Sequence, residues 1–324
     1  MDEWLEVLRY DPIGCLKSTD NKAIEFFCMR DLLGDPGGAR VEDLWSLPGA
    51  QRLTRKQQED GSWRYPNPRA ERSPVQNYSL LETFRNLGIL VEKYGMNKDH
   101  PTVQRAAEYL FSCQTGEGDF RGILGNQYMP YYIGAIMELL IKAGYGDHPG
   151  IERGFRWLLS VRQEDGGWNI PMKTAGLTYS EVFESPPVPT DRTKPFSHLI
   201  TGMVLRAFAA HPRYRRTREA LHAAGLLKGR FFKRDSIPDR GDPSYWTKFS
   251  YPYWFTDMLT SLDSLSLMGF PPDDGDIKKG LDWFVKSQKE NGSWELAMLR
   301  GGGDKNLKYW LALAICRVFK RFFG

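Results

Sequence analysis

The chain has 324 residues, of which 41% are hydrophobic and 13% aromatic, and its 44 basic and 40 acidic residues leave a net charge of +4. Charges this evenly balanced argue against a nucleic-acid-binding protein, which needs a strongly basic surface. The sequence has no run of about 18 apolar residues, so no membrane-spanning helix is predicted.

The cysteines and the N-terminal residues indicate the compartment. Cys15, Cys28, Cys113 and Cys316 show no C-x-x-C spacing, and we expect reduced thiols in the core of a cytoplasmic protein. The first residues are acidic and lack the apolar stretch of a signal peptide. No spacing of Cys, His and Asp predicts a zinc site, so we expect neither a metal nor a cofactor.

In chain order, residues 2–10 and 21–33 predict two helices around a proline break, and helices of two kinds then alternate. Amphipathic stretches predict outer helices. Stretches that are apolar on most sides predict buried inner helices. The outer helices are expected at 41–58, 101–114, 149–163, 214–232 and 275–288. The inner helices are expected at 74–88, 127–144, 196–210, 250–268 and 304–321.

A short motif returns where outer helices end. It reads QEDGSW at 58–63, QEDGGW at 163–168 and QKENGSW at 288–294, with a weaker copy, QTGEGDF, at 114–120. A period near 50 residues predicts an array of helical repeats. The Asp-Gly or Asn-Gly pair suits a turn that needs a positive φ. We interpret the Gln amide as a bridge to the neighbouring repeat, with the Trp packed beneath it.

This Q-x-x-D-G-S-W pattern resembles the QW repeat of squalene and oxidosqualene cyclases, which protein prenyltransferase β-subunits share more loosely. The resemblance covers the chain from about residue 41 to its end. It implies an all-α (α/α)6 toroid in one domain, in which residues 1–40 form a hairpin that completes the ring and residues 41–324 form the repeats. It also implies a central apolar cavity for an isoprenoid or similar lipophilic substrate.

Two connections, 169–195 and 233–249, are long and rich in proline. Loops of this length are usually functional or disordered. In a ring of antiparallel hairpins, all outer-to-inner connections lie at one end. We therefore predict the ligand site at that mouth, above the N-termini of the inner helices.

The cyclases that this chain resembles protonate their substrate with a D-x-D-D motif, which the sequence lacks. The nearest string, residues 273–276, lies on a link at the other end and is interpreted as a helix start. Asp191 precedes an inner helix where the acid motif would lie. Asp257 lies on a predicted apolar helix, where burial would raise its pKa. These two are the candidate catalytic residues, with a loop cap and a structural ion pair as the alternatives.

Aromatic and basic residues at the same mouth are the candidates for substrate binding. Tyr and Trp faces stabilise cations, although such rings also fill cores. Basic side chains on the two loops can hold a diphosphate or carboxylate headgroup, or can pair with neighbouring Asp residues. The candidates are Tyr131, Tyr132, Lys194, Phe196, His198, Trp246, Lys248, Tyr251, Tyr253, Trp254, Tyr309 and Trp310.

The sequence thus predicts a terpenoid-cyclase-like protein with a lipophilic small molecule as its partner. Two alternatives remain open: a non-catalytic toroid that binds a lipid or a protein, and a carbohydrate-active α/α-barrel enzyme. In the latter, Asp191 and Asp257 would face each other at roughly 5–10 Å. The basic and aromatic stretch 317–323 either touches an anionic membrane surface or ends the last helix with favourable cations.

Overall fold

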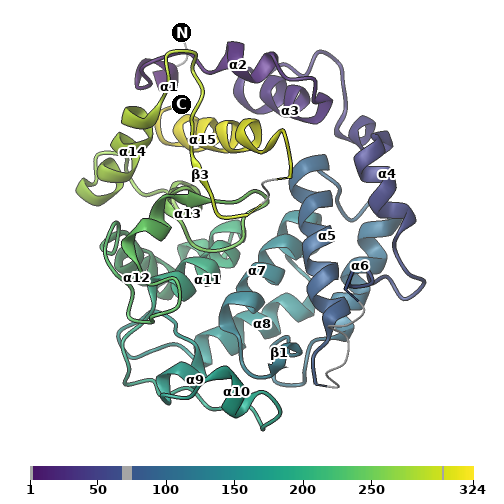
Figure 1. Cartoon of the computed structure of the whole chain (residues 1–324), viewed down its shortest axis with the longest axis vertical. Helices are drawn as coiled ribbons and strands as arrows, with labels where there is room; N and C mark the ends of the chain where they lie inside the picture. Colours follow the sequence, from purple (N-terminus) through teal and green to yellow (C-terminus); the bar gives the residue numbers. More distant parts are fainter. Residues whose placement is uncertain (1–2, 68–74, 301–302) are drawn as a thin grey trace.

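The computed structural model describes residues 3–67, 75–300 and 303–324. Six helices form its inner ring. Each packs against the next in chain order, and the last packs against the first, which closes the circle (Figure 1). They are α3 (Lys22–Phe27), α5 (Tyr78–Tyr94), α7 (Pro130–Leu140), α11 (His198–Ala210), α13 (Met258–Leu267) and α15 (Leu307–Phe323).

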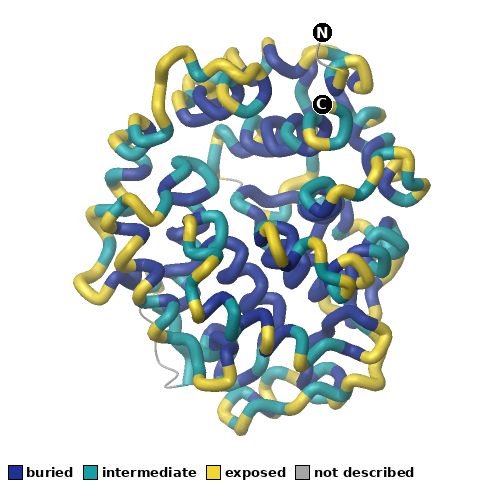
Figure 2. The backbone as a smooth tube through the Cα atoms, turned by 180° about the vertical axis from the view of Figure 1, so that it is seen from behind, coloured by how far each residue is buried: buried dark blue, intermediate teal, exposed yellow. Residues whose placement is uncertain are grey.

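The outer helices cover this ring from outside, each packed against one or two inner helices. Seen from behind, buried segments lie in the middle of the molecule and exposed ones at its border (Figure 2). The protein is therefore the all-α toroid that the sequence predicts. The outer helices are α1 (Glu3–Glu6), α2 (Ile13–Lys17), α4 (Pro48–Arg55), α6 (Pro101–Ser112), α8 (Pro149–Ser160), α12 (Arg218–Lys228) and α14 (Gly275–Ser287).

The remaining elements are short. The first long loop contains α9 (Pro171–Thr174) and α10 (Tyr179–Val182), and β1 (Ile123–Asn126) lies beside that loop. The second long loop ends in β2 (Lys248–Phe249), which pairs in parallel with β3 (Ala297–Met298). Single turns of 3₁₀-helix span Val41–Ser46, Tyr214–Arg216 and Pro243–Thr247, and π-helical turns span Cys28–Leu32 and Ile141–Tyr145.

The tryptophan of the repeated motif makes the same hydrogen bond in the three copies that have one. The indole N–H groups of Trp63, Trp168 and Trp294 each donate to the carbonyl ten residues earlier, at 2.9, 2.7 and 2.8 Å. The Gly of the motif has a positive φ, which is 85° at Gly61 and 77° at Gly292. A Cβ at either glycine would collide with a backbone carbonyl of the neighbouring repeat. Each turn therefore joins two repeats.

The bridging glutamine of the first copy is Gln57, one residue before the Gln58 that the motif suggested. The Gln57 amide donates to the carbonyls of Gly61 (2.9 Å) and Thr102 (2.8 Å), at the start of α6. In the last copy, Gln288 donates to the Tyr10 carbonyl at 2.7 Å and accepts the Tyr10 N–H at 3.1 Å. This last bridge joins the end of the repeat array to the N-terminal hairpin and closes the outer ring.

Two inner helices differ from their predicted bounds. The helix predicted at 74–88 runs from Tyr78 to Tyr94, while residue 74 lies outside the described residues. The helix predicted at 250–268 begins only at Met258, with Asp257 as its N-cap. Residues 250–257 instead form an extended segment that contains a cis Tyr251–Pro252 peptide bond. Within the parts of the chain that the structure describes, no helix is long and apolar enough to cross a bilayer.

Candidate functional site

Residues 250–257, called the central segment below, pass through the middle of the ring. The Tyr251 ring stacks on Trp310 of α15, with 5.4 Å between centroids and 9° between planes. The Tyr251 hydroxyl donates to the Glu92 carbonyl of α5 at 3.1 Å. Arg206 of α11 donates to two carbonyls of the segment, at 3.2 and 3.3 Å. Because three inner helices hold it, the segment fills part of the space that a wide cavity would need.

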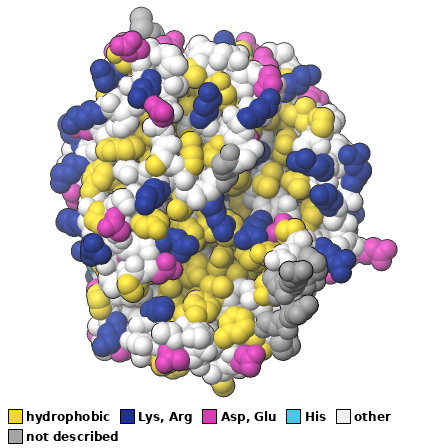
Figure 3. Space-filling view, viewed as in Figure 1, with side chains coloured by type: hydrophobic (Ala, Val, Ile, Leu, Met, Phe, Trp, Pro, Cys, Tyr) yellow, Lys and Arg dark blue, Asp and Glu magenta, His cyan; other side chains and the backbone are white. Residues whose placement is uncertain are grey.

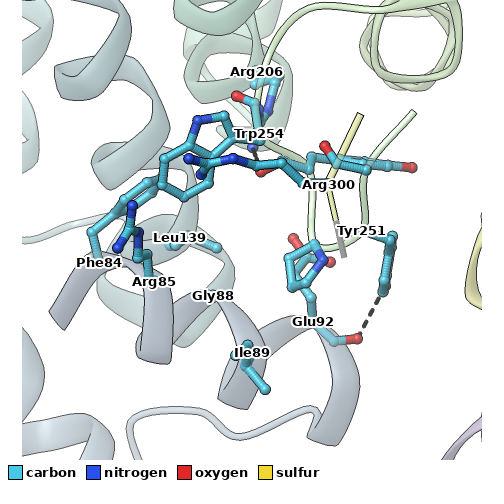
Figure 4. A pocket seen from close by; sticks show the side chains of 13 residues that line it. Phe84, Arg85, Gly88, Ile89, Glu92, Leu139, Arg206, Tyr251, Trp254 and Arg300 are labelled. Atoms are coloured by element: carbon cyan, nitrogen blue, oxygen red, sulfur yellow. Dashed lines mark hydrogen bonds between the residues drawn. The ribbon is translucent and has the colours of Figure 1, made fainter. Parts of the chain in front are cut away.

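A cavity of about 220 Å³ remains beside the central segment (Figure 4). Ligand pockets commonly have about 300–1,000 Å³, so this cavity suits a short ligand. Figure 3 shows an apolar hollow near the middle of one face, with Lys and Arg side chains along its border. The cavity is lined by Phe84, Arg85, Gly88, Ile89, Glu92, Leu139, Arg206, Ser250, Tyr251, Pro252, Tyr253, Trp254 and Arg300.

Aromatic rings form one wall of this cavity. Trp254 lies 5.3 Å from Phe84 and 6.3 Å from Tyr132 between ring centroids, and Phe84 also meets Tyr132 edge to face at 6.1 Å. Such tilted and edge-to-face pairs are the favoured geometries of aromatic side chains. The wall therefore presents ring faces and edges to a ligand in a fixed arrangement.

A buried ionic network lies behind the cavity. Arg206 Nε donates to Glu138 Oε2 at 2.6 Å, and Lys142 Nζ donates to Glu138 at 2.8 Å and to Glu92 at 2.6 Å. Burial alone would raise the pKa of Glu138, but Arg206 and Lys142 outweigh it and hold the pKa below its ordinary value. The network therefore keeps Glu138 ionised and unsuited to donate a proton.

A second and more polar hollow of about 760 Å³ lies on the other side of Tyr251 and Tyr253. It is bounded by the C-terminal ends of α5, α13 and α15, and its lining includes eight charged side chains. Cations are favourable at helix C-termini. These charged side chains are Arg30, Asp31, Glu92, Lys142, Asp263, Arg317, Lys320 and Arg321.

Asp257 is a buried carboxyl group with a perturbed pKa. It is 3% exposed, caps α13, and accepts the Thr260 backbone N–H at 2.8 Å. Burial raises its pKa to about 7, against the smaller lowering effect of the Thr260 hydrogen bonds. The direction of this shift is the one expected from its apolar surroundings. Asp257 is not one of the residues that line the cavity, and the nearest lining residue along the chain is Trp254.

Asp191 lies in a different environment. Its side chain is 40% exposed and accepts hydrogen bonds from the Thr193 backbone N–H (3.1 Å) and hydroxyl (2.6 Å). These bonds lower its pKa. The Lys194 ammonium is 3.9 Å away, and its side chain is 53% exposed. Asp191 thus makes the contacts of a loop cap, and no hydrogen bond or shared cavity joins it to Asp257 within the described residues.

The predicted binding residues divide into two groups. Tyr251, Tyr253 and Trp254 line the cavity, while Tyr131, Tyr132 and Trp310 are buried, with Tyr132 and Trp310 in contact with this lining. The second group lies outside the lining: Lys194, Phe196, His198, Trp246, Lys248 and Tyr309.

His198 and Trp246 of this second group make contacts that hold the fold together. Their rings stack at 4.5 Å, and the Trp246 indole N–H donates to the Lys233 carbonyl at 3.0 Å. Burial lowers the pKa of His198 to about 4, although Asp235 lies only 3.5 Å away. Asp235 itself accepts backbone N–H groups at the start of α11. These residues fix the second long loop on α11.

Sequence reasoning missed most of the helical cavity wall. Arg85, Gly88, Ile89 and Glu92 lie on one face of α5, at the three- and four-residue spacing that a helix gives. This spacing was visible, but the predicted helix ended before Glu92. Arg206 is a charged residue in an otherwise apolar helix, which is itself a signal of a buried ionic contact. No local pattern pointed to Ser250 or Arg300.

Comparison with known proteins finds similarity to one family over part of the chain. Residues 82–181, which include the α5 and α7 walls of the cavity, match the family model for the squalene–hopene cyclase C-terminal domain. A squalene–hopene cyclase from Zymomonas mobilis is 25% identical over 123 residues, which are 37% of this chain and 19% of that protein. The matched part of the chain is thus similar to squalene–hopene cyclases. It matches only about a fifth of that relative's length.

Solved structures with a similar arrangement of helices belong to more than one class. The type II terpene cyclase MstE from Scytonema, in a variant form, aligns at a TM-score of 0.45 with 15% identity, over 97% of this chain and 99% of the other. A polysaccharide lyase aligns at a TM-score of 0.49 with 11% identity, over 98% and 96%. Likenesses this weak say nothing about the reaction.

Proposed function

We propose that this squalene cyclase-like protein binds a short lipophilic molecule of isoprenoid type in the cavity beside Trp254. The observation that carries the proposal is the lining of that cavity, in which aromatic and aliphatic groups predominate. Glu92 is the one carboxylate among the described lining residues, and Lys142 holds it at 2.6 Å. Such a site suits binding better than proton transfer to the ligand. The similarity to a squalene–hopene cyclase supports an isoprenoid as the ligand.

Gly88 allows a direct test, because it lines the cavity from the middle of α5. A Cβ at this position would lie 3.4 Å from Leu139 Cδ1 and 3.9 Å from Pro252 Cβ, so a methyl group fits with little adjustment. A larger side chain extends into the cavity. Gly88→Leu should therefore abolish binding of geraniol and farnesol in isothermal titration calorimetry, and Gly88→Ala should weaken it.

Gly225 in α12 supplies the matched control, since nothing lies within 4 Å of a Cβ built there. Gly225→Leu should leave binding unchanged, and thermal unfolding of each variant checks that it folds. Unchanged affinity in a folded Gly88→Leu protein would refute the cavity as the binding site. Failure of both alcohols to bind the unaltered protein would refute the proposed function.

A second candidate function rests on the pKa of Asp257, which burial raises to about 7. A carboxylic acid that stays protonated near neutral pH is the group that protonation-initiated cyclisation of an isoprenoid requires. Asp257 would be the acid if the central segment moves to bring it to the ligand, since it lies three residues beyond the lining residue Trp254, and the aromatic wall would stabilise the cation. In this case, gas chromatography–mass spectrometry should detect a cyclic product from geraniol or farnesol. Asp257→Asn should abolish that product and leave binding intact.

A further inference from the structure

Three arginines gather around the aromatic wall of the cavity. The guanidinium carbons of Arg85 and Arg300 lie 5.3 and 4.2 Å from the Trp254 ring centroid, and that of Arg240 lies 4.2 Å from the Phe255 ring. Arg85 extends from α5 and Arg300 from the segment after β3, so they reach the indole from different elements (Figure 4). Arg85 and Arg300 also line the cavity itself.

The positive charge of these arginines is only partly balanced. Arg85 is 3.3 Å from Glu82, and Arg240 is 3.1 Å from Asp239. Arg300 has no carboxylate within 4.0 Å among residues 3–67, 75–300 and 303–324. Burial, followed by the charges of Arg85 and Arg240, lowers its pKa. A guanidinium that meets like charges and lacks a counter-ion is stabilised by any anion placed beside it.

An unsatisfied polar group in the same cavity gives a second and independent indication of a ligand. Ser250 lines the cavity and is 3% exposed, and its hydroxyl has no hydrogen-bond partner among the residues that the structure describes. Buried side-chain polar atoms are nearly always paired in folded proteins. The hydroxyl is therefore available to a polar group of a bound molecule.

We propose that the cavity takes a lipophilic anion, a short apolar chain that ends in a carboxylate or a phosphate. The chain lies against Phe84, Leu139 and Trp254, and the headgroup meets Arg300, supported by Arg85. A guanidinium binds either headgroup through two parallel hydrogen bonds. This inference rests on the proposed function, since it assumes that the cavity is the ligand site, and it names the class of ligand more closely.

Three ligands with the same apolar tail separate the proposed binding of a lipophilic molecule from the inferred preference for an anion. Geraniol, geranic acid and geranyl phosphate differ only in the headgroup, and isothermal titration calorimetry at pH 7.5 measures their dissociation constants. We expect at least one of the two anions to bind about tenfold or more tightly than geraniol. The two anions also distinguish a carboxylate from a phosphate as the natural headgroup.

Arg300→Gln tests the assigned contact. Arg300 is exposed, so the variant should fold, and a thermal melt checks this. It should lose about tenfold or more in affinity for the preferred anion and keep its affinity for geraniol. Arg321→Gln is the matched control, because Arg321 lies in the second hollow and already has Asp263 as its partner. This control should change neither affinity.

Each outcome decides the question. Equal affinity for geraniol and both anions would overturn the anion site and leave the proposed function standing. Tighter anion binding that survives Arg300→Gln would also overturn the assignment. If none of the three ligands binds, the proposed function and this inference both fail. Selective loss of anion binding in Arg300→Gln, with geraniol unaffected, supports the inference.

Discussion

The two hollows that meet at Tyr251 and Tyr253 use their charges differently. In the larger hollow the arginines have carboxylate partners: Arg317 is 2.8 Å from Asp31, and Arg321 bonds Asp263. In the smaller cavity Arg300 lies over the Trp254 ring and has no carboxylate within 4.0 Å among the described residues. Paired charges at the helix ends satisfy one another and hold elements together, whereas an unpaired one is free for a ligand. We therefore expect the first kind to affect stability and the second to affect binding.

The strongest way to test this comparison is to break the network between the hollows. Arg206→Met removes the guanidinium that holds Glu138, which is only 2% exposed. Breaking a buried ion pair from one side costs about 3–5 kcal/mol in the free energy of unfolding. Urea denaturation followed by circular dichroism measures it. Arg206→Met combined with Glu138→Gln should recover part of the loss. A loss below about 1 kcal/mol in the single variant would mean that the network is not structural.

The next largest effect concerns Asp257, whose folded pKa of about 7 lies above its ordinary value of 3.8. A raised carboxyl pKa stabilises the fold below pH 4, and this stability is lost as the pH rises from about 4 to about 7. Asparagine caps a helix about equally well and does not titrate. Asp257→Asn should therefore be more stable than the unaltered protein at pH 8, by about 3–4 kcal/mol, and this advantage should disappear near pH 4. Parallel pH profiles in urea denaturation would contradict the assigned pKa.

A smaller effect is expected for Arg317, whose side chain is 19% exposed and lies 4.9 Å from the Phe27 ring centroid. Arg317→Met should lower the free energy of unfolding by about 1–3 kcal/mol, because Asp31 keeps only Arg30 as its partner. Geraniol affinity should stay the same. A changed affinity with unchanged stability would reverse the roles given to the two hollows.

The smallest effect is expected for Arg321, at the outer border of the larger hollow, where its side chain is 31% exposed. Exposed ion pairs contribute about 0–1 kcal/mol. Arg321→Gln should therefore shift the free energy of unfolding by no more than about 1 kcal/mol. Urea denaturation in 0.1 and 1 M NaCl provides the check, since added salt should reduce the difference. A larger loss would show that this pair is part of the core.

The sequence predicted the ring well because its repeat is a physical unit. An amphipathic helix, a glycine turn and a tryptophan recur together, and each repeat needs the next to bury its apolar face. The sequence could not show which of two adjacent glutamines makes the bridge in the first copy of the motif. Gln57 and Gln58 are adjacent and chemically identical, and only the position of Thr102 on the next repeat selects Gln57.

The centre of the ring was harder to predict. Pro252 was compatible with the predicted helix, since proline is tolerated in a first helical turn. Contacts with α5, α11 and α15 keep residues 250–257 extended instead, and no local pattern encodes such contacts. The same holds for Arg300, which reaches Trp254 from far along the chain. Tyr251, Tyr253 and Trp254 of the cavity lining were therefore among the sequence candidates, whereas Phe84 and the arginines were not.

The bond between Gln288 and Tyr10 has a consequence for how the protein forms during synthesis. It joins residues 278 positions apart, so the last repeat must leave the ribosome before the circle can close. Contacts of such high sequence separation form slowly. Until then α15, which supports Tyr251 through Trp310, is missing, and the nascent helices form an open arc without a ligand site. The proposed site can therefore bind a ligand only after α15 has been synthesised.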